Sequence, residues 1–257
     1  MLAILKPVFG SIWKRKETKI FIGLAILTPT FILISTFLPK EANFYQPGVI
    51  GDYRIPFVGM ETMVHSTANS IVLPILALFY LTYTVFRGEA DSRTLVLYKD
   101  IKRSDIFWAK VVSLIGIIFL YSGAIFLTTL IYFYARIGHM DYATLTFWDH
   151  IDPAGNKDFF QVFFGESFSM IVCVFLAAFL SLKKGLGVTM AMSFIYLIVL
   201  VLLNNVGLPF LTPLGDKNAL YEGSNFFLIF ALSALVTLIY SSGLAHLTLK
   251  HFKQMEY

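Results

Sequence analysis

Charged residues are scarce in this chain of 257 residues. Asp, Glu, Lys and Arg together make up 14% of it, whereas hydrophobic residues make up 57%. So little polar material cannot cover a globular core in water. The composition therefore predicts a protein that lies in a lipid bilayer.

Cysteine is almost absent. Cys173 is the one cysteine in the sequence, which excludes a disulfide framework and a cluster of thiolate metal ligands. Cys173 falls inside a long apolar run, so we expect it to be a small core residue.

Catalytic motifs are missing as well. The sequence contains no G-x-x-x-x-G-K-[ST], no H-E-x-x-H and no G-x-S-x-G, the signatures of a nucleotide-binding loop, a zinc protease and a serine hydrolase. His65 and Ser66 are adjacent, but neighbours on a helix point apart and do not form a catalytic pair. We therefore expect no catalytic residue, metal or cofactor in this chain. No solvated basic domain suggests nucleic acid as a partner.

Long apolar runs are what the sequence does have. A helix of about 17 to 25 mainly apolar residues crosses the hydrocarbon of a bilayer, and six such runs are found, at 20–38, 67–86, 106–134, 163–182, 185–205 and 225–247. The expected fold is all-α, a polytopic membrane protein with six transmembrane helices in a single domain, residues 1–257. Pro29 and Pro74 each remove a backbone hydrogen bond, so we expect the first two spans to bend there.

Two shorter segments accompany the spans. Residues 1–18 carry apolar side chains at helical spacing opposite basic ones, which predicts a helix lying along the membrane surface. A frayed tail is the alternative, since Pro7 interrupts the pattern. Segment 206–224 is apolar and broken by proline, which predicts a pair of short re-entrant or interfacial helices before the sixth span.

Basic residues divide unevenly between the two sides of this layout. One side holds 15 of the 20 Lys and Arg residues, and the other side holds five: Lys40, Arg54, Arg136, Lys157 and Lys217. Cytoplasmic loops carry the excess of Lys and Arg, so both termini are predicted to be cytoplasmic. The expected location is the plasma membrane of a bacterial cell, with lipid around the spans.

The connector between the second and third spans, residues 87–105, is longer and more charged than a turn requires. Leu95, Tyr98 and Ile101 recur every three residues, and charged residues stand among them. A cytoplasmic helix with an apolar side and fixed charges can dock into a groove of another protein. The alternative is a solvated loop that lies on the lipid headgroups.

The connector resembles that of the type 2 family of ATP-binding-cassette exporter permeases. Those chains carry a glutamate, a Thr-Leu pair, an arginine and, at the start of the third span, a lysine. The matching residues here are Glu89, Thr94, Leu95, Arg103 and Lys110, with Ile106 in the expected apolar position. The family's glycine before the threonine is Arg93 here, and its Pro-Ile-Ser is Asp100, Ile101 and Lys102. The order of a short N-terminal helix, six spans and a broken segment before the sixth is also similar.

This resemblance implies a role for the connector. In that family it is the coupling helix, which docks into a cleft of a cytoplasmic ATPase subunit and carries its closure into the membrane. The residues implied to contact the ATPase subunit are Glu89, Arg93, Thr94, Leu95, Tyr98, Ile101 and Arg103. The resemblance further implies that ATP and Mg are bound by that separate chain. A second permease chain, identical or related, would complete a dimer.

Polar side chains inside the predicted spans are few. An unpaired charge near the bilayer centre costs at least about 2.5 to 3.5 kcal/mol, so polar groups kept there are candidates for function. Asn69 in the second span and Glu166 near the outer end of the fourth are therefore candidates for the substrate path, although Glu166 reaching the interface is an alternative. None of the predicted spans holds a central Asp, Glu, Lys or Arg, which argues against coupling to protons or sodium.

Two functions are compatible with these features. The first is the transmembrane subunit of an ATP-binding-cassette exporter that moves hydrophobic or amphipathic substrates out of the cytoplasm or inner leaflet. Amphipathic peptides, such as antimicrobial or cytolytic peptides, come first among its substrates, and lipid-linked glycans and drugs are alternatives. The second is a membrane-embedded enzyme or scaffold without a nucleotide motor.

Overall fold

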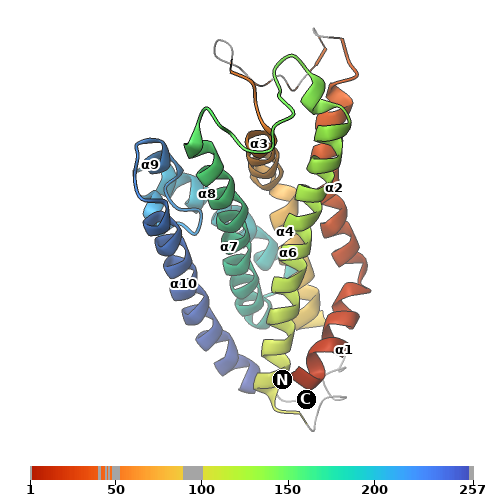
Figure 1. Ribbon diagram of the computed structural model, residues 1–257. Helices are drawn as coiled ribbons and strands as arrows, with labels where there is room; N and C mark the ends of the chain where they lie inside the picture. The colour runs from red at the N-terminus through yellow and green to blue at the C-terminus, as the bar shows by residue number, and fades with distance from the viewer. Residues whose placement is uncertain are drawn as a thin grey trace.

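The computed structural model describes residues 2–39, 42, 43, 45, 47, 53–88 and 101–254. These residues form an elongated bundle of helices (Figure 1). Its elements are α1 (Leu2–Trp13), α2 (Lys16–Ser35), α3 (Phe57–Ser70), α4 (Val72–Tyr83), η1 (Thr84–Gly88), α6 (Arg103–Ala135), η3 (Ile137–His139), α7 (Pro153–Lys183), α8 (Leu186–Asn205), η4 (Pro209–Leu211), α9 (Lys217–Tyr221) and α10 (Phe226–Gln254). Within the described ranges, extended pairing is limited to a bridge between Ile55 and Ala143. The all-α prediction is confirmed.

Several helices can cross a membrane. Five are long and apolar enough individually: α2, α6, α7, α8 and α10. The pair formed by α3 and α4 with η1 brings the number to six if it is counted as one bent span. Of the five helices, α8 and α10 are the least buried within the chain, with 17% and 22% of their most apolar window covered. The chain is therefore a multi-pass helical protein.

The second predicted span is a broken helix. Helix α3 ends at Ser70, Ile71 is extended (φ −72°, ψ 132°), and α4 begins at Val72 after a bend of 60°. The bend expected at Pro74 is therefore wrong in position. Pro74 is the third residue of α4, where a backbone N–H has no partner within the helix, so the proline costs no hydrogen bond.

The start of this span is also corrected. Helix α3 begins at Phe57, ahead of the predicted start at residue 67. Glu61, His65 and other polar side chains lower the hydropathy of α3 and hid it from a count of apolar residues. A helix that buries polar groups against other helices needs no continuous apolar surface.

Prolines elsewhere are accommodated within helices. Helix α2 continues from Lys16 to Ser35 with Pro29 inside it, so the bend expected at Pro29 does not divide the first span. Pro7 lies inside α1, and the N-terminal segment is therefore helical rather than frayed. Segment 206–224 contains the two short helical turns η4 and α9. The placement of α1 and α9 at a membrane surface stays a prediction.

Helix α1 and the last turn of α10 lie at the same end of the bundle (Figure 1), which we call the terminal end. The guanidinium of Arg103, the first residue of α6, donates a 2.7 Å hydrogen bond to the carbonyl of Lys253 near the end of α10. Helix α9 lies at the opposite end, which we call the α9 end. The chain leaves the described residues at Gly88 and returns at Ile101, both at the terminal end.

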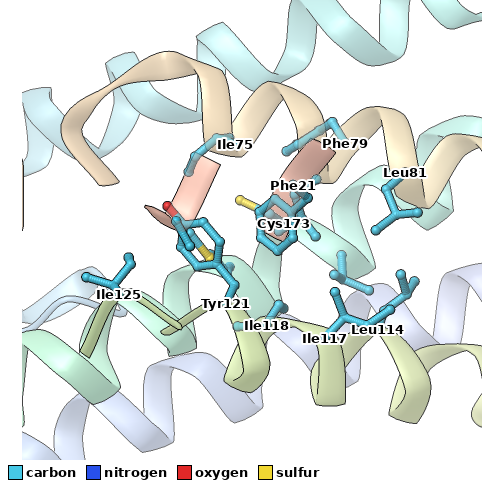
Figure 2. Close-up of a cluster of buried hydrophobic side chains, with 14 of the residues drawn as sticks. Phe21, Ile75, Phe79, Leu81, Leu114, Ile117, Ile118, Tyr121, Ile125 and Cys173 are labelled. Carbon is cyan, nitrogen blue, oxygen red and sulfur yellow. The ribbon is translucent and has the colours of Figure 1, made fainter. Parts of the chain in front are cut away.

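The core lies where α2, α4, α6 and α7 meet. Figure 2 shows Phe21, Phe79, Ile118 and Tyr121 around Cys173. The rings of Phe21 and Tyr121 stack with centroids 4.4 Å apart. Cys173 is fully buried, which confirms it as a small core residue.

Loop residues cover α3 at its N-terminal end. The carboxylate of Asp149 accepts hydrogen bonds from the backbone N–H groups of Ile151 and Asp152, at 2.9 and 2.8 Å, and from the hydroxyl of Tyr53. Burial and the neighbouring Asp149 carboxylate raise the pKa of Tyr53, so its hydroxyl keeps its proton and remains a donor. Phe57 of α3 is fully buried, and its ring lies 4.9 Å, centroid to centroid, from that of Phe147 in the same loop.

Candidate functional site

The predicted contact residues for an ATPase subunit divide between the described and undescribed parts of the chain. Five lie outside the described residues: Glu89, Arg93, Thr94, Leu95 and Tyr98. Ile101 and Arg103 are described and lie at the base of the connector. Ile101 is partly buried against the hydrophobic core, and Arg103 bonds to the end of α10. Their contact with another protein stays a prediction.

Lys110, the lysine of the family pattern, is buried at the terminal end. Its side chain is 1% exposed, and its ammonium donates a 2.8 Å hydrogen bond to the carbonyl of Val85 in η1. The rings of Phe86 and Phe252 lie 5.3 and 5.8 Å from the ammonium nitrogen. A cation over aromatic faces is attracted by their electron density. Lys110 therefore joins α6 to the turn that precedes the connector and to α10.

Arg15 adds a second bond to the same turn. Its guanidinium donates a 3.3 Å hydrogen bond to the carbonyl of Thr84, next to the one that Lys110 binds. The last carbonyls of a helix lack partners within it and carry partial negative charge, so basic side chains stabilise them. Together with the Arg103 bond to α10, these contacts fix both ends of the connector to the bundle.

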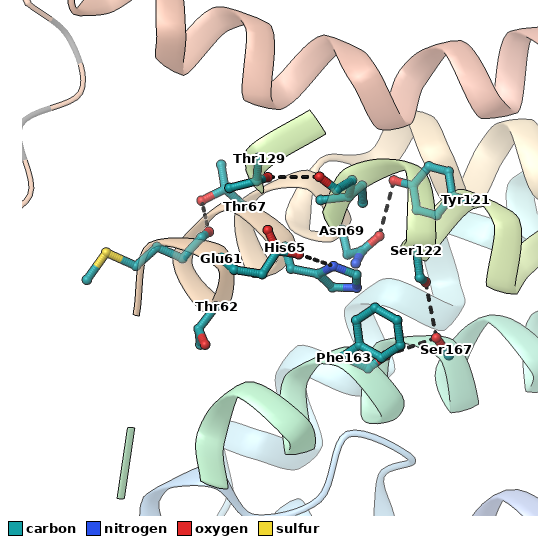
Figure 3. A network of polar contacts seen from close by, with 12 residues as sticks. Glu61, Thr62, His65, Thr67, Asn69, Tyr121, Ser122, Thr129, Phe163 and Ser167 are labelled. Atoms are coloured by element: carbon teal, nitrogen blue, oxygen red, sulfur yellow. Dashed lines mark hydrogen bonds and ion pairs between the residues drawn. The ribbon is translucent and has the colours of Figure 1, made fainter. Parts of the chain in front are cut away.

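A row of polar side chains lies inside the bundle on α3. Glu61, His65 and Asn69 follow one another at four-residue spacing, which places them on one face of the helix. They are 0, 1 and 4% exposed. Nδ1 of His65 lies 3.4 Å from Oε1 of Glu61, and the imidazole packs on Phe163 of α7 (Figure 3).

The row contains a buried acid that the predicted spans left out. Four-residue spacing of Glu61, His65 and Asn69 was a readable signal, but the predicted span began too late to include Glu61. Glu61 is fully buried and is the fifth residue of α3, near the outer end of the broken span and not at its centre. The expectation that argued against coupling to protons or sodium therefore stays a prediction.

Hydrogen bonds connect Asn69, the last residue of the row, to α6, and connect α6 to α7. The hydroxyl of Tyr121 in α6 donates a 3.2 Å hydrogen bond to Oδ1 of Asn69. Ser122 and Ser167 join α6 to α7 with their hydroxyl oxygens 3.1 Å apart (Figure 3). Nδ2 of Asn69 has no hydrogen-bond partner among the described residues.

A cavity opens beside Asn69. Its volume is about 540 Å³, and it lies between the α3–α4 break, α7, α8 and the segment that carries η4 and α9. Asn69 and Glu166, the two predicted residues of the substrate path, both line it. The structure thus brings together two side chains that are far apart in the sequence. Their role in transport stays a prediction.

Lys217 also lines the cavity, and sequence reasoning did not select it. Its ammonium nitrogen lies 4.0 Å from Oε1 of Glu166, and the two side chains are 30% and 14% exposed. Lys217 comes from α9, which no local pattern connects with α7. Only the folded chain shows that the two charges meet.

The segment that carries Lys217 is held on α7. The side-chain amide of Gln161 donates a 2.8 Å hydrogen bond to the carbonyl of Leu214. The hydroxyl of Tyr221 donates a 2.9 Å hydrogen bond to Oδ2 of Asp158, and burial, followed by the charge of Asp158, raises the pKa of Tyr221. Tyr221 therefore remains a neutral donor at ordinary pH. These bonds keep α9 over the mouth of the cavity.

The described residues contain no group of three or more His, Cys, Asp or Glu side chains that could hold a metal ion. Comparisons with known proteins identify no relative, since no family model, no curated protein and no solved structure matches the chain.

Replacing Lys110 with Met is expected to destabilise the terminal end. The substitution keeps an unbranched side chain but leaves the carbonyl of Val85 without its donor, so the free energy of unfolding should fall by about 1 to 3 kcal/mol. Thermal unfolding in detergent micelles measures the change. Lys184→Met, at an exposed position on the same predicted side, is the control and should unfold as the wild type does. An unchanged unfolding temperature for Lys110→Met would contradict this role.

Glu61 and His65 are expected to destabilise the bundle as a pair. Changing both together, Glu61→Met with His65→Leu, should raise the free energy of unfolding by about 1 to 4 kcal/mol, because apolar side chains replace an incompletely bonded buried pair. His65→Leu alone should lower it, since the carboxylate then loses its nearest partner. Chemical denaturation in micelles compares the variants, with Thr67→Val on the exposed side of α3 as the control. A double variant less stable than His65→Leu would refute the interpretation.

Proposed function

We propose that the chain is the transmembrane subunit of an ATP-binding-cassette exporter. The observation that carries the proposal is the attachment of the connector: Arg15 and Lys110 bind the turn before it, and Arg103 binds α10 after it. Lys110 and Arg103 are residues of the family pattern that the connector resembles.

These contacts suit the transmission of force from a separate motor. A displacement of the connector acts on η1 and on the start of α6, to which it is joined directly. Through hydrogen bonds it also acts on the start of α2 and on α10. Closure of an ATPase subunit around the connector would therefore move several helices together, which is what alternating access requires.

The cavity supports an outward path for an amphipathic substrate. It offers polar groups from Asn69 and Glu166 beside apolar side chains of α8. Peptides that combine both characters are the first candidates for cargo, and lipid-linked glycans and drugs are alternatives. The cavity lies beside the break between α3 and α4, where the helix ends leave backbone groups without partners in the helix. Substrate sites of many transporters lie at such breaks.

A second permease chain is part of the proposal. Helices α8 and α10 are the least buried candidate spans, and they present apolar side chains such as Val201 and Leu238, which are 59% and 66% exposed. This surface faces lipid and leaves room for a partner permease. The proposed assembly contains two permease chains and two cytoplasmic ATPase chains, which bind ATP and Mg.

A carrier driven by protons is a second candidate function. Its support is the fully buried Glu61–His65 pair, because buried carboxylate and imidazole groups in spans often relay protons. Transport assays in energised vesicles distinguish the two functions. Vanadate stops transport that depends on the ATPase, whereas a protonophore stops transport that depends on a proton gradient.

Charge placed on the apolar side of the connector is expected to release the ATPase subunit. In the variant Leu95→Asp with Tyr98→Asp, the yield of a co-purifying protein with Walker motifs should fall about tenfold, because two apolar contacts become hydrated charges. Co-purification from native membranes, followed by vanadate-sensitive ATP hydrolysis, measures the loss.

The matched control carries the same kind of change at the other end of the bundle. Ile151 is 74% exposed and lies near α3 at the α9 end, so Ile151→Asp should retain the ATPase at wild-type yield. Retention of the ATPase by the connector variant, or the absence of any Walker-motif protein in the wild-type sample, would reject the exporter.

A further inference from the structure

We propose that the cavity beside Asn69 binds the ammonium or guanidinium group of an amphipathic molecule at Glu166, and that Lys217 is a built-in cation that the ligand displaces. This inference rests on the proposed function, because it names the chemical class of molecule that enters the substrate path. It concerns the binding site alone and does not depend on how transport is driven.

Glu166 supplies the negative charge. Its carboxylate projects from α7 into the cavity and is 14% exposed. Within the described ranges it accepts no hydrogen bond, and its nearest cation is the Lys217 ammonium at 4.0 Å, the outer limit of an ion pair. A carboxylate placed among apolar side chains is costly unless a cation compensates it. Lys217 compensates it incompletely, so the site favours a closer cation.

Asn69 forms part of the cavity wall. Its Oδ1 accepts the hydroxyl of Tyr121, which fixes the amide in place, and Nδ2 is left without a partner among the described residues. The residue is 4% exposed and lines the cavity. Buried amide donors are nearly always bonded. Because Nδ2 is itself buried, Asn69 shapes the wall of the cavity and its amide is not assigned to the ligand.

The break between α3 and α4 places two helix ends at the cavity. Helix α3 stops at Ser70, which lines the cavity, and Ile71 is extended, so the last carbonyls of α3 have no partners further along the helix. The C-terminal end of a helix carries partial negative charge and stabilises a nearby cation. The N-terminal end of α4, whose first residue Val72 also lines the cavity, carries partial positive charge and offsets this effect, so the preference for a cation rests on Glu166.

The remaining wall of the cavity is apolar, and it determines that the rest of the ligand should be apolar. Leu197, Ile198 and Val201 of α8 line it, and Ile198 and Val201 are more than half exposed, so this wall continues onto the outer face of α8. An apolar tail can remain in contact with this face while the cationic group reaches Glu166. A small hydrophilic cation gains nothing from the apolar wall, whereas an amphipathic one does.

Lys217 stands at the mouth of the cavity on a rigid support. The residue follows Gly215, which has φ +72°, and a Cβ at Gly215 would collide with the side chains of Ser233 and Gln161. The backbone is therefore seated closely on α7 and α10, which places the Lys217 ammonium 4.0 Å from Glu166. A ligand cation must displace this ammonium, so removing it should strengthen binding.

The test uses the purified permease in nanodiscs of phosphatidylcholine, without ATPase or nucleotide. The probe is a dansyl fluorophore joined through a twelve-carbon chain to a primary amine, and the matched neutral probe is its N-acetyl derivative. Fluorescence titration is expected to show that the wild type binds the amine more tightly than the neutral probe. Glu166→Gln should weaken binding of the amine about tenfold and leave the neutral probe unchanged, the loss expected when one partner of a partly buried charge pair is removed.

Lys217→Gln gives a result of opposite sign. It should tighten binding of the amine several-fold, which damage to the fold would not produce. Glu17→Gln is the charge-matched control, because Glu17 lines a separate cavity near the start of α2, and it should bind both probes as the wild type does. Equal wild-type affinity for the two probes, unchanged amine binding by Glu166→Gln, or weaker amine binding by Lys217→Gln would each overturn the proposal. Loss of the ATPase interaction affects none of these titrations, so the two proposals fail separately.

Discussion

A helix that ends among apolar side chains must find donors for its last carbonyl groups, and this constraint organises the terminal end of the bundle. Lys110, buried beneath Phe86 and Phe252, supplies the donor for η1 from a distant helix. Arg15 and Arg103 supply donors for the same turn and for α10. Because these side chains come from the start of α2 and from α6, satisfying the carbonyls also joins the helices to one another. The connector is therefore preceded by a bonded turn and contains, near its end, the bonded Arg103.

The half of the bundle toward the α9 end leaves more of its buried polar groups without hydrogen-bond partners among the described residues. Glu61, His65 and Asn69 form a polar row whose hydrogen bonds within the described residues do not use all of their atoms. Natural chains keep such groups at a cost in stability mainly where they bind or move something. The row ends at the cavity that Glu166 and Lys217 share. The incompletely bonded groups and the open volume are thus parts of one region between α3 and α7.

The sequence predicted much of the fold because hydropathy alone marks long buried or lipid-facing helices. The helices α6, α8 and α10 begin within a few residues of the predicted spans. Helix α3 was missed over half of its length because its polar face is covered by α6 and α7, and such cover depends on tertiary packing. The bend was predicted at Pro74 instead of Ile71, because a proline inside a helix removes a backbone hydrogen bond. In the first turn of a helix a proline removes none.

The candidate site was harder to predict for the same reason. Asn69 and Glu166 could be selected singly as polar residues in apolar runs, but their shared cavity depends on how α3 packs against α7. Lys217 belongs to a short helix with no apolar period, so nothing in the local sequence connects it with Glu166. Lys110 was selected by resemblance, and its burial and its bond to Val85 became evident only in the folded chain.

The break at Ile71 has a mechanical consequence. An unbroken α-helix resists bending because each turn is bonded to the next, whereas a single extended residue interrupts that ladder and leaves two dihedral angles as a pivot. Helix α4 with η1 can therefore change its tilt without dragging α3 along. The portion tied to Arg15 and Lys110 would swing while the portion bearing His65 stays packed on Phe163. Such a swing would alter the width of the cavity beside Ser70 and leave the part of its wall that α3 forms in place.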